Sequence, residues 1–292
     1  MVENLDKYIV QKQQAEKKVK IGGAIAVFGA IFFLGFLGAA SIFIAIAGLL
    51  IGLIIAGIGL GAFNKLSKTF KSEVLTGLVD TFVDNGRFDP NAGLSQGQVY
   101  STEFLKRADR FHTEDYLSGE MEGVAFVSSD VKLAERHVEH TKNGTRTYYE
   151  TYFLGRVFIF EFNKEFQGYL QVLEGGRPTV NRKYEKVKLE SVQFNKKFKT
   201  YATNEHSAFY VLTPHLMEAL MDFEKKNKGK IQFSFLGSKL HIGINNFKDT
   251  FELKMFRKLD QSVFDEFKRE LLVIQDVIKE LRLNNNIFKK GV

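Results

Sequence analysis

The chain contains no cysteine and no tryptophan, and only 3 of its 292 residues are proline. Without cysteine it can form no disulfide, thiolate nucleophile or cysteine-ligated zinc site. This absence agrees with a reducing compartment such as the cytoplasm. The sequence also has no P-loop, no GxGxxG motif and no repeat at a solenoid period, which argues against a nucleotide-phosphate cradle and a repeat architecture. We therefore expect no cofactor and no catalytic or metal-ligating motif.

Charge is missing from one long stretch, residues 21–63. These 43 residues include no charged side chain, and Ser41 is the only clearly polar one. A single helix of this length would be about 65 Å long at ~1.5 Å per residue. The hydrocarbon core of a bilayer is only about 30 Å thick. The run therefore predicts a transmembrane helical hairpin that folds back between Gly35 and Ser41.

Both halves of this run carry small residues at intervals of four: Gly22, Ala26 and Ala30, then Gly48, Gly52 and Ala56. Such spacing makes a smooth stripe on a helix, and two such stripes allow helices to approach closely. Chance in a Gly/Ala-rich span is the alternative. We favour a packed helix pair because the connection is too short to separate the two helices.

Lysines flank the apolar run on both sides, whereas its turn carries no charge. The flanking residues are Lys17, Lys18, Lys20, Lys65, Lys68 and Lys71. Basic flanks remain in the cytoplasm, so we expect a plasma-membrane protein with two spans and both termini inside. The run does not resemble a cleaved secretory signal.

The remaining sequence predicts an α+β fold, with an antiparallel sheet and packed helices and without βαβ alternation. We divide the chain into a short N-terminal cytoplasmic segment, the transmembrane hairpin, a juxtamembrane helix with a boundary, a cytoplasmic α+β domain, and a C-terminal amphipathic helix with its tail. Their ranges are 1–20, 21–63, 64–93, 94–260 and 261–292.

Periodicity predicts helices at 66–82, 95–111 and 262–283. A further helix starts at Thr213-Pro214, where a capping hydroxyl precedes a proline at the first helical position. Apolar residues on both faces of 146–162 indicate a central strand.

Turn and strand signals fill the rest of the domain. Lys142-Asn143-Gly144-Thr145 predicts a hairpin turn. Shorter strands are expected at 167–173, 187–194 and 199–201. A second hairpin is expected around Gly237-Ser238.

Candidate chemical groups are few. His137 and His140 stand near Glu135 and Glu139, but residues three apart on a strand point to opposite faces, so exposed histidines on a hairpin explain them better than a metal site. Asp115 and Gly119 are open to a functional or a turn interpretation. An enzyme would require a site assembled from scattered residues such as Asp115, His206, Glu218 and His241.

Positive charge is concentrated between residues 177 and 199. The formal net charge of the whole chain is +7. Two acidic residues, Glu185 and Glu190, stand among eight basic ones: Arg177, Arg182, Lys183, Lys186, Lys188, Lys196, Lys197 and Lys199. This basic stretch is either a solvated strand edge kept soluble by lysine or a contact surface for anionic lipid head groups or an acidic partner. Nucleic acid is not expected as a partner of a membrane-tethered chain.

Three segments resemble a known family: Glu114–Gly119 (EDYLSG), Phe158–Gly168 (FIFEFNKEFQG) and Phe198–Leu220, with Leu212-Thr213-Pro214 as its most specific part. Their order and spacing are similar to those of the bacterial domain-of-unknown-function family 3137, over most of residues 64–260. The resemblance implies two N-terminal membrane spans, a cytoplasmic α+β domain and a LemA-like membrane protein as a partner. It implies no activity and no catalytic residue.

These observations favour a membrane-anchored, cytoplasmic-facing binding or scaffold module, integral to the lipid bilayer. The alternative is an envelope-associated enzyme. A pocket lined by several of the four scattered residues would favour the enzyme, and a closed core with a basic or apolar surface would favour binding.

Overall fold

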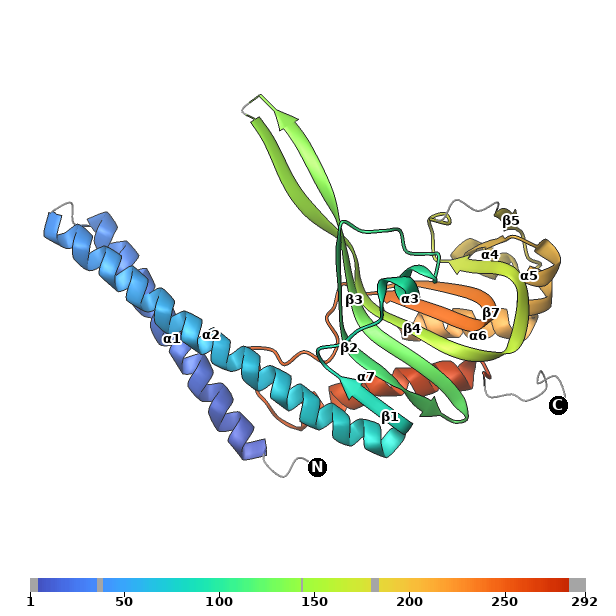
Figure 1. The fold of residues 1–292 in the computed structure, drawn as a ribbon, viewed down its shortest axis with the longest axis horizontal. Helices are drawn as coiled ribbons and strands as arrows, with labels where there is room; N and C mark the ends of the chain where they lie inside the picture. Colours follow the sequence, from blue (N-terminus) through green and yellow to red (C-terminus); the bar gives the residue numbers. More distant parts are fainter. Residues whose placement is uncertain (1–4, 36–38, 143, 180–183, 284–292) are drawn as a thin grey trace. The chain divides into compact units, whose positions relative to one another are not determined.

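The computed structural model describes residues 5–35, 39–142, 144–179 and 184–283 (Figure 1). The chain divides into two compact units. Unit 1 contains the chain up to Leu75 together with Phe251–Phe267, and unit 2 contains Thr76–Thr250 together with the chain from Lys268 onward. The elements, in order, are α1 (Leu5–Gly35), α2 (Ala39–Phe82), β1 (Asp84–Asp89), α3 (Gln96–Tyr100), β2 (Arg110–Met121), β3 (Val124–Thr141), β4 (Gly144–Leu173), β5 (Glu185–Val187), α4 (Val192–Lys197), β6 (Lys199–Ala202), α5 (Glu205–Val211), α6 (Pro214–Lys226), β7 (Lys230–Asn245) and α7 (Gln261–Glu280).

In unit 1, α1 and α2 run antiparallel and touch along their small residues. A Cβ atom added to Gly22 would lie 2.4 Å from the backbone nitrogen of Ala56, and one added to Gly52 would lie 2.5 Å from that of Ala26. Only hydrogen fits in these positions, so the backbones themselves are in contact. The packed pair expected from the four-residue spacing is confirmed at these positions. Part of the expected fold-back, residues 36–38, lies outside the described residues.

One described helix, Ile42–Phe82, is long and apolar enough to cross a membrane, with a mean hydropathy of 2.8 in its best window. Length and composition alone give weak support for a membrane span. The coarser expectation, an apolar helix of spanning length, is therefore met, whereas the second crossing is not shown.

The polar end of unit 1 is fastened by the returning segment Phe251–Phe267. The Nζ of Lys12 donates to the backbone carbonyl of Arg257 over 2.7 Å, and that of Lys71 to a carboxylate oxygen of Glu252 over 2.6 Å. The Phe70 ring contacts Tyr8 edge-on at 5.2 Å between centroids. Burial, followed by the neighbouring Glu73, raises the pKa of Tyr8 to about 12. The part of α2 around Phe70 and Lys71 therefore packs against other segments of the same chain, as its periodic apolar face predicts.

Unit 2 is built on a seven-stranded sheet of order β1-β2-β3-β4-β6-β5, with β7 also paired to β4. All its pairings are antiparallel. The 30-residue β4 forms the centre: its first part pairs with β3, and its later part pairs with β7 and β6. The strand predicted at 146–162 is present and longer than expected, but within the described chain only the part from Gly155 onward is central, because residues 146–154 pair with β3 alone. The α+β class with an antiparallel sheet is likewise confirmed.

Each face of the sheet has its own apolar core. On one face, Phe158 and Phe160 of β4 pack in a cluster with Leu220 of α6 and Leu271 of α7. On the other, Val157 and other apolar residues of the sheet form a cluster with residues from α3 and the loop after it. Alternation along β4 explains why a single strand feeds both cores.

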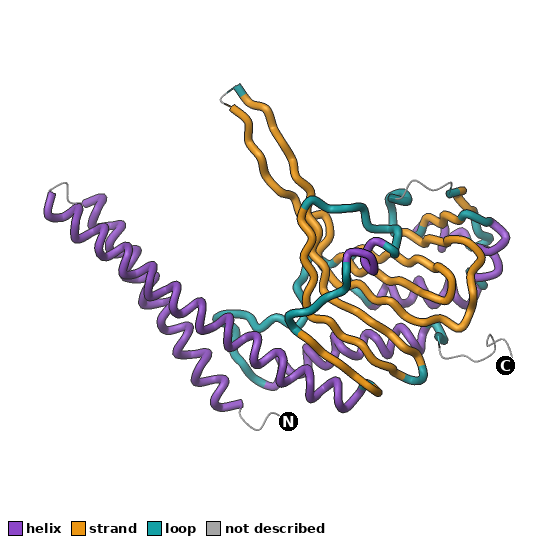
Figure 2. Tube along the Cα trace, viewed as in Figure 1, coloured by secondary structure: helices purple, strands orange, loops and turns teal. Residues whose placement is uncertain are grey.

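The β3–β4 hairpin extends beyond the rest of the sheet as a two-stranded ribbon (Figures 1 and 2). Pairing with β2 ends at Ala134, and pairing of β4 with β7 begins at Gly155. We call residues 135–154 the arm. The hairpin predicted at Lys142–Thr145 is confirmed, although Asn143 of its turn lies outside the described residues.

Several local predictions are wrong. The helix expected at 95–111 is only Gln96–Tyr100, and it begins with a capping box between Ser95 and Gln98. The strand expected at 187–194 ends at Val187, and α4 follows at Val192 because Ser191 caps it.

The expected hairpin at Gly237-Ser238 is also absent from the described chain. Strand β7 continues through this point because it follows the bend of β4, pairing Leu240 with Phe160 and then Phe235 with Leu170. Asp84–Asp89, expected as part of a boundary, forms edge strand β1.

Candidate functional site

A charged cluster lies buried where β2, β3 and β4 run side by side. The backbone of Asp115 has φ +57°, and the register of β2 against β3 shifts between Glu114 and Leu117. These are the marks of a β-bulge, which re-aims the bulged side chain. The turn interpretation of Asp115 is therefore wrong: this segment continues as strand β2.

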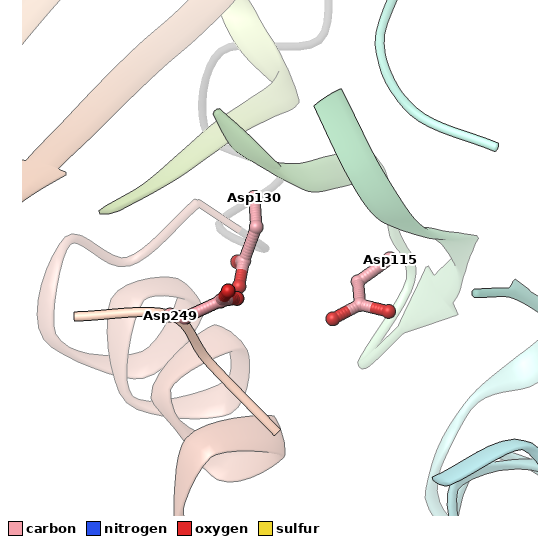
Figure 3. A group of neighbouring side chains, drawn as sticks. All are labelled: Asp115, Asp130 and Asp249. Atoms are coloured by element: carbon pink, nitrogen blue, oxygen red, sulfur yellow. The ribbon is translucent and has the colours of Figure 1, made fainter. Parts of the chain in front are cut away.

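The bulge brings Asp115 close to Asp130 of β3 and to Asp249 of the loop after β7 (Figure 3). One carboxylate oxygen from each residue lies within 4.8 Å of the others. Asp115 and Asp130 are buried, whereas Asp249 is exposed. Carboxylates in such a group have the chemistry to hold a cation.

Arg156 of β4 supplies positive charge to this cluster. Its Nη1 donates to Oδ1 of Asp130 over 2.9 Å, and its Nη2 donates to the backbone carbonyl of Asp115 over 3.1 Å and to the hydroxyl of Ser128 over 3.2 Å. The other oxygen of Asp130 accepts from the backbone nitrogen of Thr250 over 2.6 Å. Both oxygens of Asp130 are thus engaged by the protein, so the arrangement is that of a buried ion pair with its hydrogen bonds satisfied.

Gly119, the other residue of this segment left open by the sequence, has a structural role. A Cβ at this position would lie 2.3 Å from a methyl carbon of Val83 and 2.9 Å from the carbonyl oxygen of Asp84. The chain entering β1 passes directly over it. Glycine permits this close approach.

The four scattered residues named for an enzyme site lie on four different elements. His206 and Glu218 are exposed, on α5 and α6. Asp115 and His241 are buried in the sheet, but Asp115 approaches Asp130, which pairs with Arg156, whereas His241 pairs with Ile159.

Positions 156 and 159 of one strand face opposite sides of the sheet. The sheet therefore separates Asp115 from His241, and the four residues do not form one constellation. His241 bonds the Ser234 hydroxyl at 3.3 Å, and burial lowers its pKa to about 4, so the ring is neutral at pH 7.

The histidines of the arm have separate partners. His137 stacks on Tyr148 and lies 3.3 Å from a carboxylate oxygen of Glu150. His140 lies 3.1 Å from the hydroxyl of Thr145. Both are on β3, as expected for exposed histidines of a hairpin.

The basic stretch is spread over a loop and three short elements, β5, α4 and β6. Its described and exposed members are Arg177, Lys186, Lys188, Lys196 and Lys199. Arg182 and Lys183 lie outside the described residues. Two exposed carboxylates, Glu185 and Glu190, accompany them.

Lys197 differs from these exposed cations. Its ammonium group lies 2.8 Å from Glu174 and 2.6 Å from Glu224. Hydrogen bonds to Glu174 and then to Glu224 raise its pKa above the usual value. Because two carboxylates already surround it, we exclude Lys197 from the basic surface.

Apolar side chains are exposed on α4 and on the following helix, α5. Val192 of α4 is 65% exposed, and Phe209 and Tyr210 of α5 are 45% and 58% exposed. Helix α5 contacts both β5 and β6. We define the mixed surface as the five exposed cations together with these three apolar residues.

The sequence did not single out Arg156 or Asp130. A usable signal was present, because a charged residue within the apolar run of a central strand is almost never buried without a partner. Arg156, between Gly155 and Val157, is such a residue. The fold and these sites define an α+β domain attached to a helical unit, with a buried ion pair and two exposed features, the arm and the mixed surface.

Residues 151–283 match the family described as protein of unknown function (DUF3137). This match supports the resemblance noted in the sequence. The match includes the specific segment at Leu212-Thr213-Pro214, whereas Glu114–Gly119 lies outside it.

A comparison with curated proteins found no match. Among solved structures, the mycobacterial trehalose monomycolate transport factor A, TtfA, is similar over 66% of this chain and 88% of that chain, with 9% identity and a TM-score of 0.37. A likeness at this level carries no argument about this chain.

Proposed function

We propose that the protein is a membrane-anchored binding or scaffold module whose α1–α2 hairpin crosses the plasma membrane twice, with both termini cytoplasmic. Large apolar side chains point outward from both helices; Phe28 is 76% and Phe43 is 75% exposed. Soluble proteins rarely expose a contiguous apolar surface of this kind, whereas hydrocarbon would cover it. The lysine flanks support the orientation.

A reporter fusion tests this topology. Alkaline phosphatase is active only after export, so a fusion after Val292 should be inactive, whereas a fusion of a cytoplasmic fluorescent protein at the same position should be bright. A highly active phosphatase fusion would place the C-terminus outside and refute the proposed orientation.

We propose further that the mixed surface binds anionic lipid head groups. The observation that carries this proposal is the exposure of Val192 on α4, and of Phe209 and Tyr210 on α5, the helix that contacts β5 and β6. Apolar side chains beside lysines are typical of surfaces that enter the head-group region, where apolar contact adds to charge attraction. An acidic protein needs only the charges, so the exposed aromatic residues favour lipid.

Electrostatics sets the size of the expected effect. Each lysine or arginine near an anionic leaflet contributes about 1 kcal/mol, and only within a Debye length of about 8–10 Å. Five such residues are enough for measurable binding at low salt. High salt should abolish it.

Liposome sedimentation tests the lipid proposal with a fragment of residues 76–292, which keeps β1 and the whole sheet. Its cooperative melting is measured first, to establish that it folds. It should sediment with vesicles containing phosphatidylglycerol at low salt, remain soluble with neutral vesicles, and dissociate as salt rises.

Charge reversal supplies the control. Replacing Lys186, Lys196 and Lys199 with Glu should abolish sedimentation. The same number of reversals elsewhere, at Lys132, Lys239 and Lys248, should have a much smaller effect. If the folded fragment does not bind anionic vesicles, the lipid proposal is wrong, and an acidic protein such as a LemA-like membrane partner becomes the hypothesis to test by pull-down.

A further inference from the structure

The arm exposes an open strand edge on β4. Pairing of β4 with β7 begins at Gly155, and within the described chain no strand pairs with residues 144–154 on the side away from β3. An unpaired edge displays free backbone donors and acceptors that can template another strand. A two-stranded ribbon is by itself only marginally stable in water. The protein nevertheless projects one from its sheet (Figure 2).

The base of this edge is capped by Asn245, whose Oδ1 accepts from the backbone nitrogen of Leu154 over 3.1 Å and whose Nδ2 donates to the carbonyl of Tyr152 over 2.9 Å, so the open part of β4 is residues 144–151. The outer edge of β3 is capped at its base as well. There, the backbone nitrogen of Arg136 donates to a carboxylate oxygen of Asp109 over 2.8 Å. Beside this bond, Lys106 forms an ion pair with Glu135. These side chains block the base of the β3 edge. The open part of β4, residues 144–151, contains neither lysine nor proline, the usual guards of an exposed edge.

The bond to Asp109 also fixes which backbone groups point outward. Since the Arg136 nitrogen points away from β4, the alternate residues Val138 and His140 share that direction. Directly opposite residues in an antiparallel pair have the same hydrogen-bonding status. The outward groups of β4 therefore belong to the residues opposite these three: Thr145, Thr147 and Tyr149.

The side chains along the open edge are self-complementary. Placing a second β4 antiparallel to the first, with Tyr148 opposite its own copy, sets Thr147 opposite the partner's Tyr149. The outward backbone groups then meet and can exchange hydrogen bonds. The same register sets Arg146 opposite the partner's Glu150, twice by symmetry. Opposite charges directly across two strands stabilise their pairing.

Within one copy the charge of Glu150 is poorly matched. It stands directly opposite Glu135 on β3, and its side chain is 67% exposed. Like charges in this position disfavour strand pairing. The partner's Arg146 would supply the missing positive charge on the free side. This match favours a second copy of the chain over an unrelated strand.

We propose that the protein self-associates through the open edge of its arm, β4 against β4, in the register that places Tyr148 on the two-fold axis. The interface is isologous: each copy contributes the same residues, and the pairing closes at two copies. It joins two β3–β4 ribbons into one four-stranded sheet. A binding module of this kind would act as a dimer at the membrane.

Single-cysteine crosslinking tests the register, because the chain has no cysteine of its own. The full-length Tyr148→Cys chain, in its own membrane with a mild oxidant, should form a disulfide-linked dimer. The matched control is Thr145→Cys, on the same open edge, which this register places opposite residue 151 rather than opposite itself. No dimer with Tyr148→Cys, or equal dimer with both variants, overturns the proposal.

Charge exchange gives a second test. Added to the Tyr148→Cys chain, Arg146→Glu should reduce the crosslinked fraction about tenfold, since two pairs change from attraction to repulsion. Adding Glu150→Arg as well should restore it. Failure of the double change to restore crosslinking refutes the register. A measurement without the cysteine guards against a folding defect caused by Tyr148→Cys. The parent chain, Arg146→Glu, and Arg146→Glu with Glu150→Arg are compared by molecular mass in detergent. The parent and the double variant should be dimeric, and Arg146→Glu should be monomeric.

Discussion

Removing the positive charge from the buried cluster should destabilise unit 2 severely. Arg156 and Asp130 each have side chains only 5% exposed, and their atoms approach to 2.9 Å. The change Arg156→Met keeps much of the aliphatic volume but leaves the carboxylate of Asp130 buried without its cation. Breaking a buried pair from one side typically costs about 3–5 kcal/mol.

This cost is large compared with the total free energy of unfolding of a domain. Domains of this size are stable by about 5–15 kcal/mol, and each kcal/mol shifts the melting temperature of a domain of roughly 200 residues by about 2–4 °C. We therefore expect Arg156→Met to lower the melting temperature of the 76–292 fragment by about 6–20 °C. Differential scanning calorimetry or near-UV circular dichroism would measure it.

A second substitution separates charge from packing. In Arg156→Met with Asp130→Asn, both charges of the ion pair are gone, while the amide oxygen can still accept the bond from the backbone of Thr250. Stability should recover a substantial part of the loss. A melting temperature of Arg156→Met within 2 °C of the parent would refute the reasoning, because it would mean that the pair is hydrated or that the cluster relaxes at no cost.

Three further predictions concern other parts of the structure. Leu271→Ala should cost the 76–292 fragment about 2–5 kcal/mol, because Leu271 is 0% exposed in the sheet core; Arg269→Ala, on the exposed side of the same helix, should melt as the parent does. Gly52→Ala should weaken the α1–α2 pair, because its Cβ would lie 2.5 Å from the facing backbone, whereas Gly57→Ala, with nothing within 4 Å, should leave the thermal stability of the full chain in detergent unchanged. Burial lowers the pKa of His241 to about 4, so between about pH 6.5 and 4 the unfolded chain binds a proton at this position more readily than the folded chain does. The free energy of unfolding should therefore fall by up to about 3 kcal/mol as the pH falls through this window. His241→Gln should lose this part of the pH dependence in urea titrations, and an unchanged dependence would contradict the assignment.

The elements predicted correctly have local causes. The helix at Pro214 begins where the Thr213 hydroxyl accepts a bond from the backbone of Leu216, a pattern contained in four adjacent residues. The C-terminal helix has an apolar seam at three- and four-residue spacing, and Leu271 and Ile278 of that seam are buried. Such signals can be read from the sequence without knowledge of a distant partner.

Two of the wrong predictions, at Gly237-Ser238 and at Asp115, have a different cause, which is pairing between distant segments. Gly237-Ser238 has the composition of a turn, yet β7 runs straight through it because β4 offers a continuous partner. Asp115 fits a turn interpretation because Asp and Gly commonly occupy turns, but β3 holds the segment in the sheet as a bulge. In both cases the pairing strand lies more than ten residues away in the sequence, so local patterns do not reveal it.

The two open features of unit 2 differ in how far the sequence could reveal them. Clustered lysines are visible by counting, and only the pairing of Lys197 with two glutamates needed coordinates. The arm required more, since a hairpin signal at Asn143-Gly144 does not say where the neighbouring strands stop. The arm starts where pairing of β3 with β2 ends, at Ala134, and where pairing of β4 with β7 begins, at Gly155.

Arg156 shows how a sequence can point to a long-range contact without locating it. A guanidinium among buried apolar residues must find an acceptor, because leaving it unpaired in the core costs several kcal/mol. The strand before the hairpin offers one carboxylate in its apolar part, Asp130. Beside the turn, facing positions have numbers that sum to 285, as in Thr141 with Gly144, and a one-residue bulge in β4 between Thr151 and Phe153 raises the sum to 286, which Asp130 and Arg156 satisfy. Without that bulge Asp130 would face position 155, and Arg156 would point to the opposite face. The pair therefore fixes the register of the central strands as well as depending on it.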